Sequence, residues 1–94
     1  MNTVLPDRID LVFETHYKPL CVFANKILQN QEAAEDVVQE LFVKLCERPE
    51  VLPDEIIDAK RYLYAAVRNN CLKEIRIDKK WKNYIDSTIW DEID

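Results

Sequence analysis

The chain contains no glycine in 94 residues, whereas glycine makes up about 7% of ordinary sequences. Glycine supplies the positive backbone φ angles of tight hairpin turns, and it lets phosphate-cradling loops and nucleophile elbows approach their ligands closely. A chain without glycine is poorly suited to β-hairpins and to those catalytic loops. We therefore expect an all-α fold. It should form one compact domain, because 94 residues with 48% hydrophobic side chains provide a single core.

Hydrophobic periodicity predicts two helices in the first half of the chain. The first spans residues 6–28, and Pro19 should kink it or briefly break it, because proline removes a backbone donor and crowds the preceding turn. The hydrophobic stripe continues in phase beyond Pro19, which favours one bent helix over two. The second spans residues 31–47, with Asn30 as its N-cap and Pro49 ending it. Together with a third helix in the second half of the chain, they predict a bundle of three helices, or of four if the first helix is split.

The third predicted helix spans residues 59–78, with Asp58 as its N-cap. The last residues, 79–94, have no clear periodicity and no predicted structure. Five apolar side chains are assigned to the core rather than to function, namely Phe13, Leu20, Leu41, Leu63 and Val67.

The charges are distributed unevenly along the chain. Residues 1–58 carry 5 basic and 12 acidic side chains, residues 59–83 carry 8 and 2, and residues 84–94 carry 0 and 4, within a net charge of −5. The overall charge argues against binding to nucleic acid, since contacts with phosphates require lysine and arginine. The concentration of positive charge in residues 59–83, however, favours such a contact there.

Neither an active site nor a metal centre can be assembled from the available side chains. Cys21, Cys46 and Cys71 include no CxxC pair and His16 is the single histidine, so we interpret the cysteines as free thiols that pack as small hydrophobic side chains. Ser87 is the only serine. We expect no enzyme activity, no cofactor and no metal. The absence of a signal peptide and of a run of about 20 apolar residues predicts a cytoplasmic protein without membrane insertion.

Two of the predicted helices have distinctive outer faces. The second carries Glu35, Asp36, Gln39, Glu40, Lys44 and Glu47, and this pattern alone is typical of a solvated helix surface. On the third helix, Arg61, Tyr64 and Arg68 lie at i, i+3 and i+7, and Arg76 falls near the same meridian two turns later. Cationic and aromatic side chains on one stripe are typical of surfaces that bind phosphates and stack on bases.

Two segments resemble the sigma factors of bacterial transcription initiation. Residues 35–45, EDVVQELFVKL, resemble region 2.2, and residues 60–69, KRYLYAAVRN, resemble region 2.4. Together with residues 17–20, YKPL, they resemble the ECF group as it occurs in Bacteroidetes-like bacteria. Two motifs in the correct order and at the correct distance make this resemblance far more specific than either motif alone.

The resemblance implies which residues contact core RNA polymerase. In sigma factors the region 2.2 helix docks through its polar face on the clamp coiled coil of the β′ subunit, and the matching residues here are Asp36, Gln39 and Glu40. Carboxylates and an amide suit a partner helix that carries arginine and lysine. The family also implies an anti-sigma factor as a partner.

The resemblance likewise implies contacts with the non-template strand of the promoter minus-ten element, which the family recognises and melts. The loop at residues 48–57 corresponds to the base-capturing loop of the family. Lysine and arginine side chains are expected along the phosphates, Tyr62 or Tyr64 at the fork of the separating strands, and Asn69 near the flipped base. The implied DNA-binding residues are Lys60, Arg61, Tyr62, Tyr64, Arg68, Asn69, Lys73 and Arg76.

The resemblance assigns residues 1–78 to the region 2 domain and residues 79–94 to the start of an interdomain linker or to a C-terminal tail. A complete ECF factor has a second helical domain that reads the minus-thirty-five element. We expect the chain to be a piece of such a factor. The alternative is a single-domain relative with weak DNA affinity of its own.

Two other functions remain open. A helical protein-interaction module, or a sigma mimic that binds polymerase or a regulator without reading DNA, would share the polar face of the second helix. Such a module has no need for the stripe of Arg61, Tyr64, Arg68 and Arg76. A helix-turn-helix DNA-binding protein is disfavoured, because the connection at residues 48–58 is too long for its turn.

Overall fold

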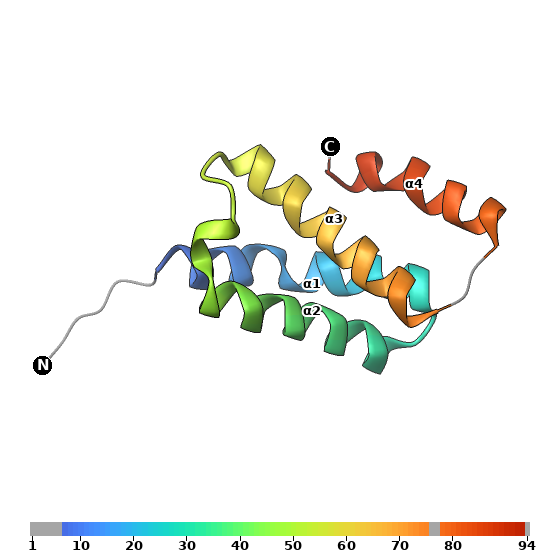
Figure 1. Ribbon diagram of the computed structural model, residues 1–94, viewed down its shortest axis with the longest axis horizontal. Coiled ribbons are helices and arrows are strands. Elements are labelled where there is room, and N and C mark those ends of the chain that lie inside the picture. Colours follow the sequence, from blue (N-terminus) through green and yellow to red (C-terminus); the bar gives the residue numbers. More distant parts are fainter. Residues whose placement is uncertain (1–6, 76–77, 94) are drawn as a thin grey trace, which may run out of the picture.

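The computed structural model describes residues 7–75 and 78–93, apart from the side chains of Trp90 and Glu92, and every regular element within them is helical. The α-helices are α1 (Arg8–Leu28), α2 (Gln31–Glu47), α3 (Ile56–Glu74) and α4 (Lys79–Ile93). A short 3-10 turn, η1 (Pro49–Val51), lies between α2 and α3 (Figure 1). The all-α prediction is confirmed, and the bundle contains four helices for a reason that the sequence analysis did not foresee.

The helix α1 continues through Pro19 without a break. Its N-terminus is capped by Asp7, whose carboxylate accepts a hydrogen bond from the Asp10 backbone N–H at 2.9 Å. Its C-cap, Gln29, adopts a left-handed conformation with φ of 54°. Because no glycine is available, a glutamine occupies the position that glycine usually fills at a helix end. The first helix thus ends at Leu28 as predicted and is not split, and it begins at Arg8, whereas the predicted start at Pro6 lies outside the described residues.

The helix α2 has the predicted ends. The Asn30 side chain accepts a hydrogen bond from the Ala33 backbone N–H at 3.0 Å, and the helix ends at Glu47, before Pro49. The buried side chains of α2 are Ala34, Val37, Val38, Leu41, Phe42 and Leu45.

The ends of α3 differ from the prediction. The helix begins at Ile56 with Glu55 as its N-cap, three residues before the predicted start, and Asp58 lies inside the first turn. An acidic side chain is favourable there because of the helix dipole, so an acidic residue near a helix start does not identify the cap itself. The helix ends at Glu74, and Asp78 instead accepts a hydrogen bond from the Trp81 backbone N–H at 2.7 Å, at the start of α4.

The helix α4 is formed by residues for which the sequence predicted no structure. Ile85, Ile89 and Ile93 recur at four-residue intervals and are buried, with Trp81 one step earlier and half-buried. This spacing is the signal that could have identified the helix. α4 packs against α3 on the side away from α2 (Figure 1).

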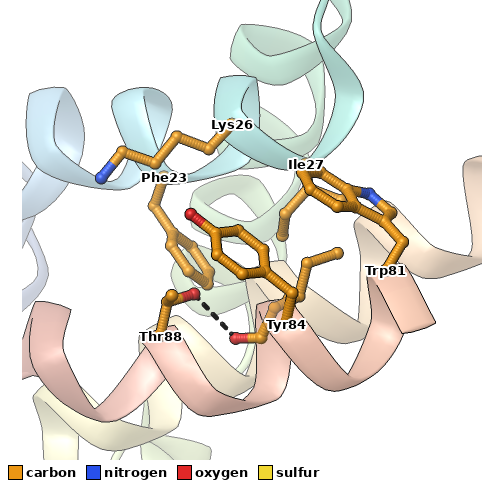
Figure 2. Close-up of a pocket in the computed structure, with 7 residues that line it drawn as sticks. Phe23, Lys26, Ile27, Trp81, Tyr84 and Thr88 are labelled. Atoms are coloured by element: carbon orange, nitrogen blue, oxygen red, sulfur yellow. Dashed lines mark hydrogen bonds between the residues drawn. The ribbon is translucent and has the colours of Figure 1, made fainter. Parts of the chain in front are cut away.

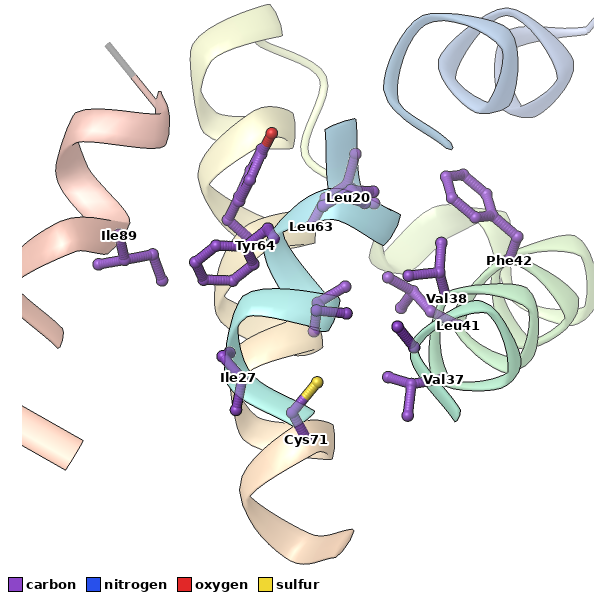
Figure 3. Packing of buried hydrophobic residues seen from close by; sticks show 14 of the residues in the cluster. Leu20, Ile27, Val37, Val38, Leu41, Phe42, Leu63, Tyr64, Cys71 and Ile89 are labelled. Atoms are coloured by element: carbon purple, nitrogen blue, oxygen red, sulfur yellow. The ribbon is translucent and has the colours of Figure 1, made fainter. Parts of the chain in front are cut away.

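The core lies where α1 packs between α2 and α3. Leu20, Leu41, Leu63 and Val67 are buried as predicted, and Figure 3 shows the first three among the packed side chains. Phe13 was assigned to the core, but its side chain is 39% exposed. It lies at the edge of the α1–α2 contact, stacked on Tyr17 with ring centroids 4.7 Å apart. No helix within residues 7–75 and 78–93 is long and apolar enough to cross a membrane.

Candidate functional surfaces

The three residues expected to bind polymerase lie together on the solvent-exposed face of α2. Asp36, Gln39 and Glu40 are all exposed, and we call them the α2 polar patch. The Gln39 side-chain amide donates a hydrogen bond to the Tyr17 hydroxyl at 2.9 Å, which orients the amide toward α1. The Glu40 carboxylate pairs with Lys44 at 3.4 Å. The patch is acidic, with one of its two carboxylates partly compensated.

An apolar margin adjoins the α2 polar patch. Phe13 and Val43 are 39% and 57% exposed, and they line a shallow surface hollow together with Gln39, Phe42 and Cys46. The Phe13 ring also contacts Phe42 edge-on, with ring centroids 5.0 Å apart. The sequence analysis missed this margin because it assigned Phe13 to the core. A polar patch beside exposed apolar side chains is the usual composition of a protein-binding surface.

The residues expected to bind DNA differ in exposure. Arg61, Asn69 and Lys73 are exposed on α3, whereas Lys60, Tyr62 and Arg68 are half-buried. The Arg61 guanidinium approaches Asp58 at 4.0 Å. Arg76 lies outside the described residues. The surface of α3 is therefore basic, but its cationic side chains differ in how far they are exposed to solvent.

Tyr64 requires a correction. It was expected on the outer stripe of α3, but its side chain is only 2% exposed. Its ring contacts Phe23 of α1 edge-on, with centroids 5.1 Å apart, and Figure 3 shows Tyr64 within the packed cluster. Periodicity therefore correctly placed Tyr64 beside the basic residues but wrongly made it solvent-exposed, whereas Arg61 of the same stripe is exposed as predicted.

Two cationic side chains of α3 are held by α4. The Arg68 Nε atom donates a hydrogen bond to the Asp86 carboxylate at 2.7 Å, and its Nη1 atom donates to the Asn69 side-chain oxygen at 2.7 Å. The Lys60 ammonium donates to the Ile93 backbone carbonyl at 2.7 Å. A cation at the C-terminus of a helix is favourable, since the carbonyl end of the helix dipole is negative.

The connection between α2 and α3 is bonded to α1 near its middle and leads to two exposed apolar residues at the start of α3. Leu52 is 2% exposed, and the Arg8 guanidinium donates hydrogen bonds to the backbone carbonyls of Leu52 and Pro53. Ile56 and Ile57 are 85% and 44% exposed. Their side chains therefore present apolar surface at the start of the basic helix, where the sequence analysis could not assign individual pocket residues.

The titratable side chains that could bind a metal are dispersed. Within the described part of the chain, no three of His, Cys, Asp and Glu are grouped as metal ligands. Burial, followed by the charge of Lys60, lowers the pKa of His16. Cys71 is buried, Cys21 is half-buried, and Cys46 is exposed, so the prediction that all three cysteines pack in the core is wrong for Cys46. Its position late in α2, on the outer side of the buried stripe, explains this exposure.

Comparisons with known proteins agree on one family. The family model for sigma-70 region 2 matches residues 12–81. The ECF RNA polymerase sigma factor SigL of Mycobacterium tuberculosis, matched in three strains, is 30% identical to this chain over 77 residues. That alignment covers 82% of this chain and 43% of SigL, so the chain spans less than half the length of this relative. No solved structure matches the chain.

Proposed function

We propose that this chain, which belongs to the sigma-70 region 2 family and is of the ECF type, binds core RNA polymerase through α2 and recognises and melts the promoter minus-ten element through α3. The observation that carries the polymerase contact is the α2 polar patch. Asp36, Gln39 and Glu40 are exposed on one face of a helix whose buried face is fully used by the core. The proposed partner is the clamp coiled coil of the β′ subunit.

The surroundings of the α2 polar patch support this contact. An acidic patch pairs with arginine and lysine of a partner helix, and such pairs fix the orientation of the complex and speed its formation. Phe13 and Val43 add apolar area that loses water when the partner docks. Gln39 is oriented beforehand by Tyr17, so less side-chain freedom is lost on binding.

The proposed DNA surface combines α3 with the loop at residues 48–57. Arg61 and Lys73 supply charge for phosphates, and Asn69 supplies an amide for a base edge. Exposed Ile56 and Ile57 supply apolar surface for an extruded base. Lys60, Tyr62 and Arg68 are proposed contacts that need local rearrangement, and Arg76 remains a prediction.

The charge distribution suggests that DNA binding depends on the polymerase. The positive charge of residues 59–83 is exceeded by the negative charge of the rest of the chain, so long-range attraction between the free domain and DNA is weak. Docking of the α2 polar patch on a cationic partner neutralises part of the negative charge. We therefore expect tight binding to promoter DNA only within the holoenzyme. Tight binding of the free domain to duplex promoter DNA at physiological salt would contradict this.

The alternative function is a helical interaction module that binds polymerase or a regulator without reading DNA. One observation favours it. Lys60 and Arg68 are bonded to α4, and Tyr64 is buried, so these side chains of the proposed DNA surface are occupied. The two functions differ in whether the complex with polymerase gains affinity for a single-stranded minus-ten oligonucleotide.

The double variant Asp36→Arg with Gln39→Ala should bind core polymerase at least about tenfold more weakly than the wild type, because it places a cation against a cationic partner and removes the oriented amide. Pull-down with purified core enzyme, followed by titration, measures this. Glu14→Arg is the charge-matched control for the aspartate change, on an exposed position of α1, and should bind normally. Tyr17→Phe, which removes only the hydroxyl that orients Gln39, should have a small effect.

The outcomes of this experiment separate the two functions. Core binding together with oligonucleotide affinity supports the sigma function. Core binding without any oligonucleotide affinity supports the interaction module. If the double variant binds core as well as Glu14→Arg does, the α2 polar patch is not the polymerase contact.

Arg61→Ala should weaken oligonucleotide binding by the polymerase complex and make it less dependent on salt. Each lost phosphate contact with a single strand lowers the slope of log affinity against log salt by about 0.7. Fluorescence anisotropy at several salt concentrations measures the slope. Lys18→Ala, an exposed cation on α1, is the matched control and should leave the slope unchanged. Equal slopes for Arg61→Ala and the wild type would remove Arg61 from the DNA surface.

A further inference from the structure

The helix α4 covers one continuous stripe of α3. Lys60, Tyr64 and Arg68 are spaced four residues apart, so their side chains lie on one side of the helix. The two cations, Lys60 and Arg68, are bonded to α4, and Tyr64 between them packs on Phe23 of α1. Two of these residues, Tyr64 and Arg68, belong to the predicted cationic and aromatic stripe, whereas Arg61 of that stripe is exposed. The helix therefore occupies part of the proposed DNA surface.

The polar contacts of α4 use the same chemistry as a nucleic-acid backbone. The Asp86 carboxylate accepts from Arg68 at 2.7 Å, and the Ile93 carbonyl accepts from Lys60 at 2.7 Å. An anionic oxygen on arginine and a carbonyl oxygen on lysine occupy donors that phosphate oxygens also require. Residues 84–94 carry four acidic and no basic side chains, which strengthens the likeness to a polyanion. DNA and α4 cannot use Arg68 and Lys60 in this way at the same time.

The apolar contacts hold α4 in place but leave its seam with α1 incompletely filled. Ile85, Ile89 and Ile93 are buried. A cavity of about 90 Å³ remains between the two helices, lined by residues such as Phe23, Trp81 and Ile85, and Figure 2 shows these two helices on opposite sides of it. Tyr84, on the rim, is 56% exposed. A 15-residue helix has little stability of its own in water, so its docking and its folding depend on these contacts.

We propose that α4 is a displaceable cover that competes within the chain for the strand-binding side of α3. When α4 is docked, Arg68 and Lys60 are bonded to it and Tyr64 is buried. When α4 leaves, the two cations become available to phosphates. The proposal rests on the proposed function, because it takes single-stranded promoter DNA as the competing ligand.

The test uses the complete 94-residue chain bound to core polymerase, with a single-stranded minus-ten oligonucleotide as the probe. Asp86→Asn weakens the bond to Arg68 and should raise oligonucleotide affinity by about 2- to 5-fold, as expected for a partly exposed charge pair that biases a two-state equilibrium. Asp91→Asn is the matched control, with the same charge change at an exposed position of the same helix, and should change affinity less than about twofold. Ile89→Ala loosens the helix without any change of charge and should act in the same direction as Asp86→Asn.

Displacement of α4 can be followed independently of binding. The only two tryptophans of the chain are Trp81 and Trp90, both in α4, so tryptophan emission reports on this helix alone. Asp86→Asn and Ile89→Ala should shift the emission to longer wavelength before any oligonucleotide is added. Amide hydrogen exchange over residues 79–93 should increase in both variants, while exchange in α2 stays unchanged.

The outcomes distinguish this proposal from the proposed function. If the variants loosen α4 and their oligonucleotide affinity does not exceed that of Asp91→Asn, α4 is a structural helix and the proposal of a displaceable cover is wrong. The proposed sigma function is not affected by that result. If no variant, including the wild type, binds the oligonucleotide in the presence of core polymerase, the DNA-reading function fails and α4 has no ligand to compete with. If oligonucleotide affinity rises in the variants that release α4, the proposal that α4 is a displaceable cover is supported.

Discussion

At about pH 8, iodoacetamide should alkylate Cys71 in the folded chain at least about 10³ times more slowly than it alkylates Cys71 in the urea-unfolded chain. The thiolate is the reactive species, and burial, followed by the charge of Glu74, raises the pKa of the Cys71 thiol to about 12. At this pH such a thiol is ionised in about one molecule in ten thousand, compared with about a quarter for a thiol in a model peptide. The side chain is also fully buried, so the reagent has no direct access to it.

Mass spectrometry of the alkylated peptides gives the rate at each cysteine separately. Cys46 is the internal control, because it is exposed and should react at similar rates in the folded and unfolded chains. Cys21 is half-buried, and burial raises its pKa, so its rate should be intermediate. Rapid alkylation of Cys71 in the folded chain, at the rate of Cys46, would mean that the end of α3 opens readily and that Cys71 is not a core residue.

The raised pKa of the Cys71 thiol also determines how the free energy of unfolding should change with pH. The folded-state pKa of Cys71 is raised above its unfolded value, so folding is favoured by this group below about pH 9, and that contribution is lost as the pH rises toward about 12. Each unit of difference corresponds to about 1.4 kcal/mol. Urea unfolding between about pH 8 and pH 11 should show a steeper loss of stability for the wild type than for Cys71→Ala. Parallel curves would assign the alkaline loss to other groups.

The sequence predicted the helices whose ends are marked by a chemical signal. Asn30 and Pro49 bound α2 because one caps the backbone N–H groups and the other cannot continue a helix. The start of α3 was misplaced because Asp58 is favourable in the first turn as well as at the cap. The α2 polar patch was predicted from periodicity and family resemblance together, and its three residues are exposed as expected.

The error at Tyr64 and the omission of α4 have the same cause. Periodicity tells which side chains share a face of a helix, but not whether a second helix covers that face. The spacing of Ile85, Ile89 and Ile93 carried the missing information, since a helix with an apolar stripe needs a surface to bury it against. Had that stripe been identified, the side of α3 that carries Lys60 and Arg68 could have been proposed as its partner.

Phe23→Ala should lower the free energy of unfolding by about 3–5 kcal/mol, which is a large share of the roughly 5–15 kcal/mol that stabilises a small domain. The Phe23 side chain is 1% exposed and lies where three helices meet. It extends from α1, contacts Tyr64 of α3 edge-on, and lines the cavity beneath α4. Its removal enlarges an existing void, and neighbouring side chains held by three separate helices cannot collapse into it easily.

Urea unfolding followed by circular dichroism measures this effect, and two variants calibrate it. Phe13→Ala removes the same ring from the same helix at a position that is 39% exposed, and should cost about 1 kcal/mol. Phe23→Leu keeps most of the volume and should cost less than about 1.5 kcal/mol. Because Phe23 supports α4, tryptophan emission in Phe23→Ala should shift to longer wavelength at urea concentrations below the main transition. If Phe13→Ala and Phe23→Ala destabilise the chain equally, Phe23 does not link the three helices, and the docked position of α4 does not depend on it.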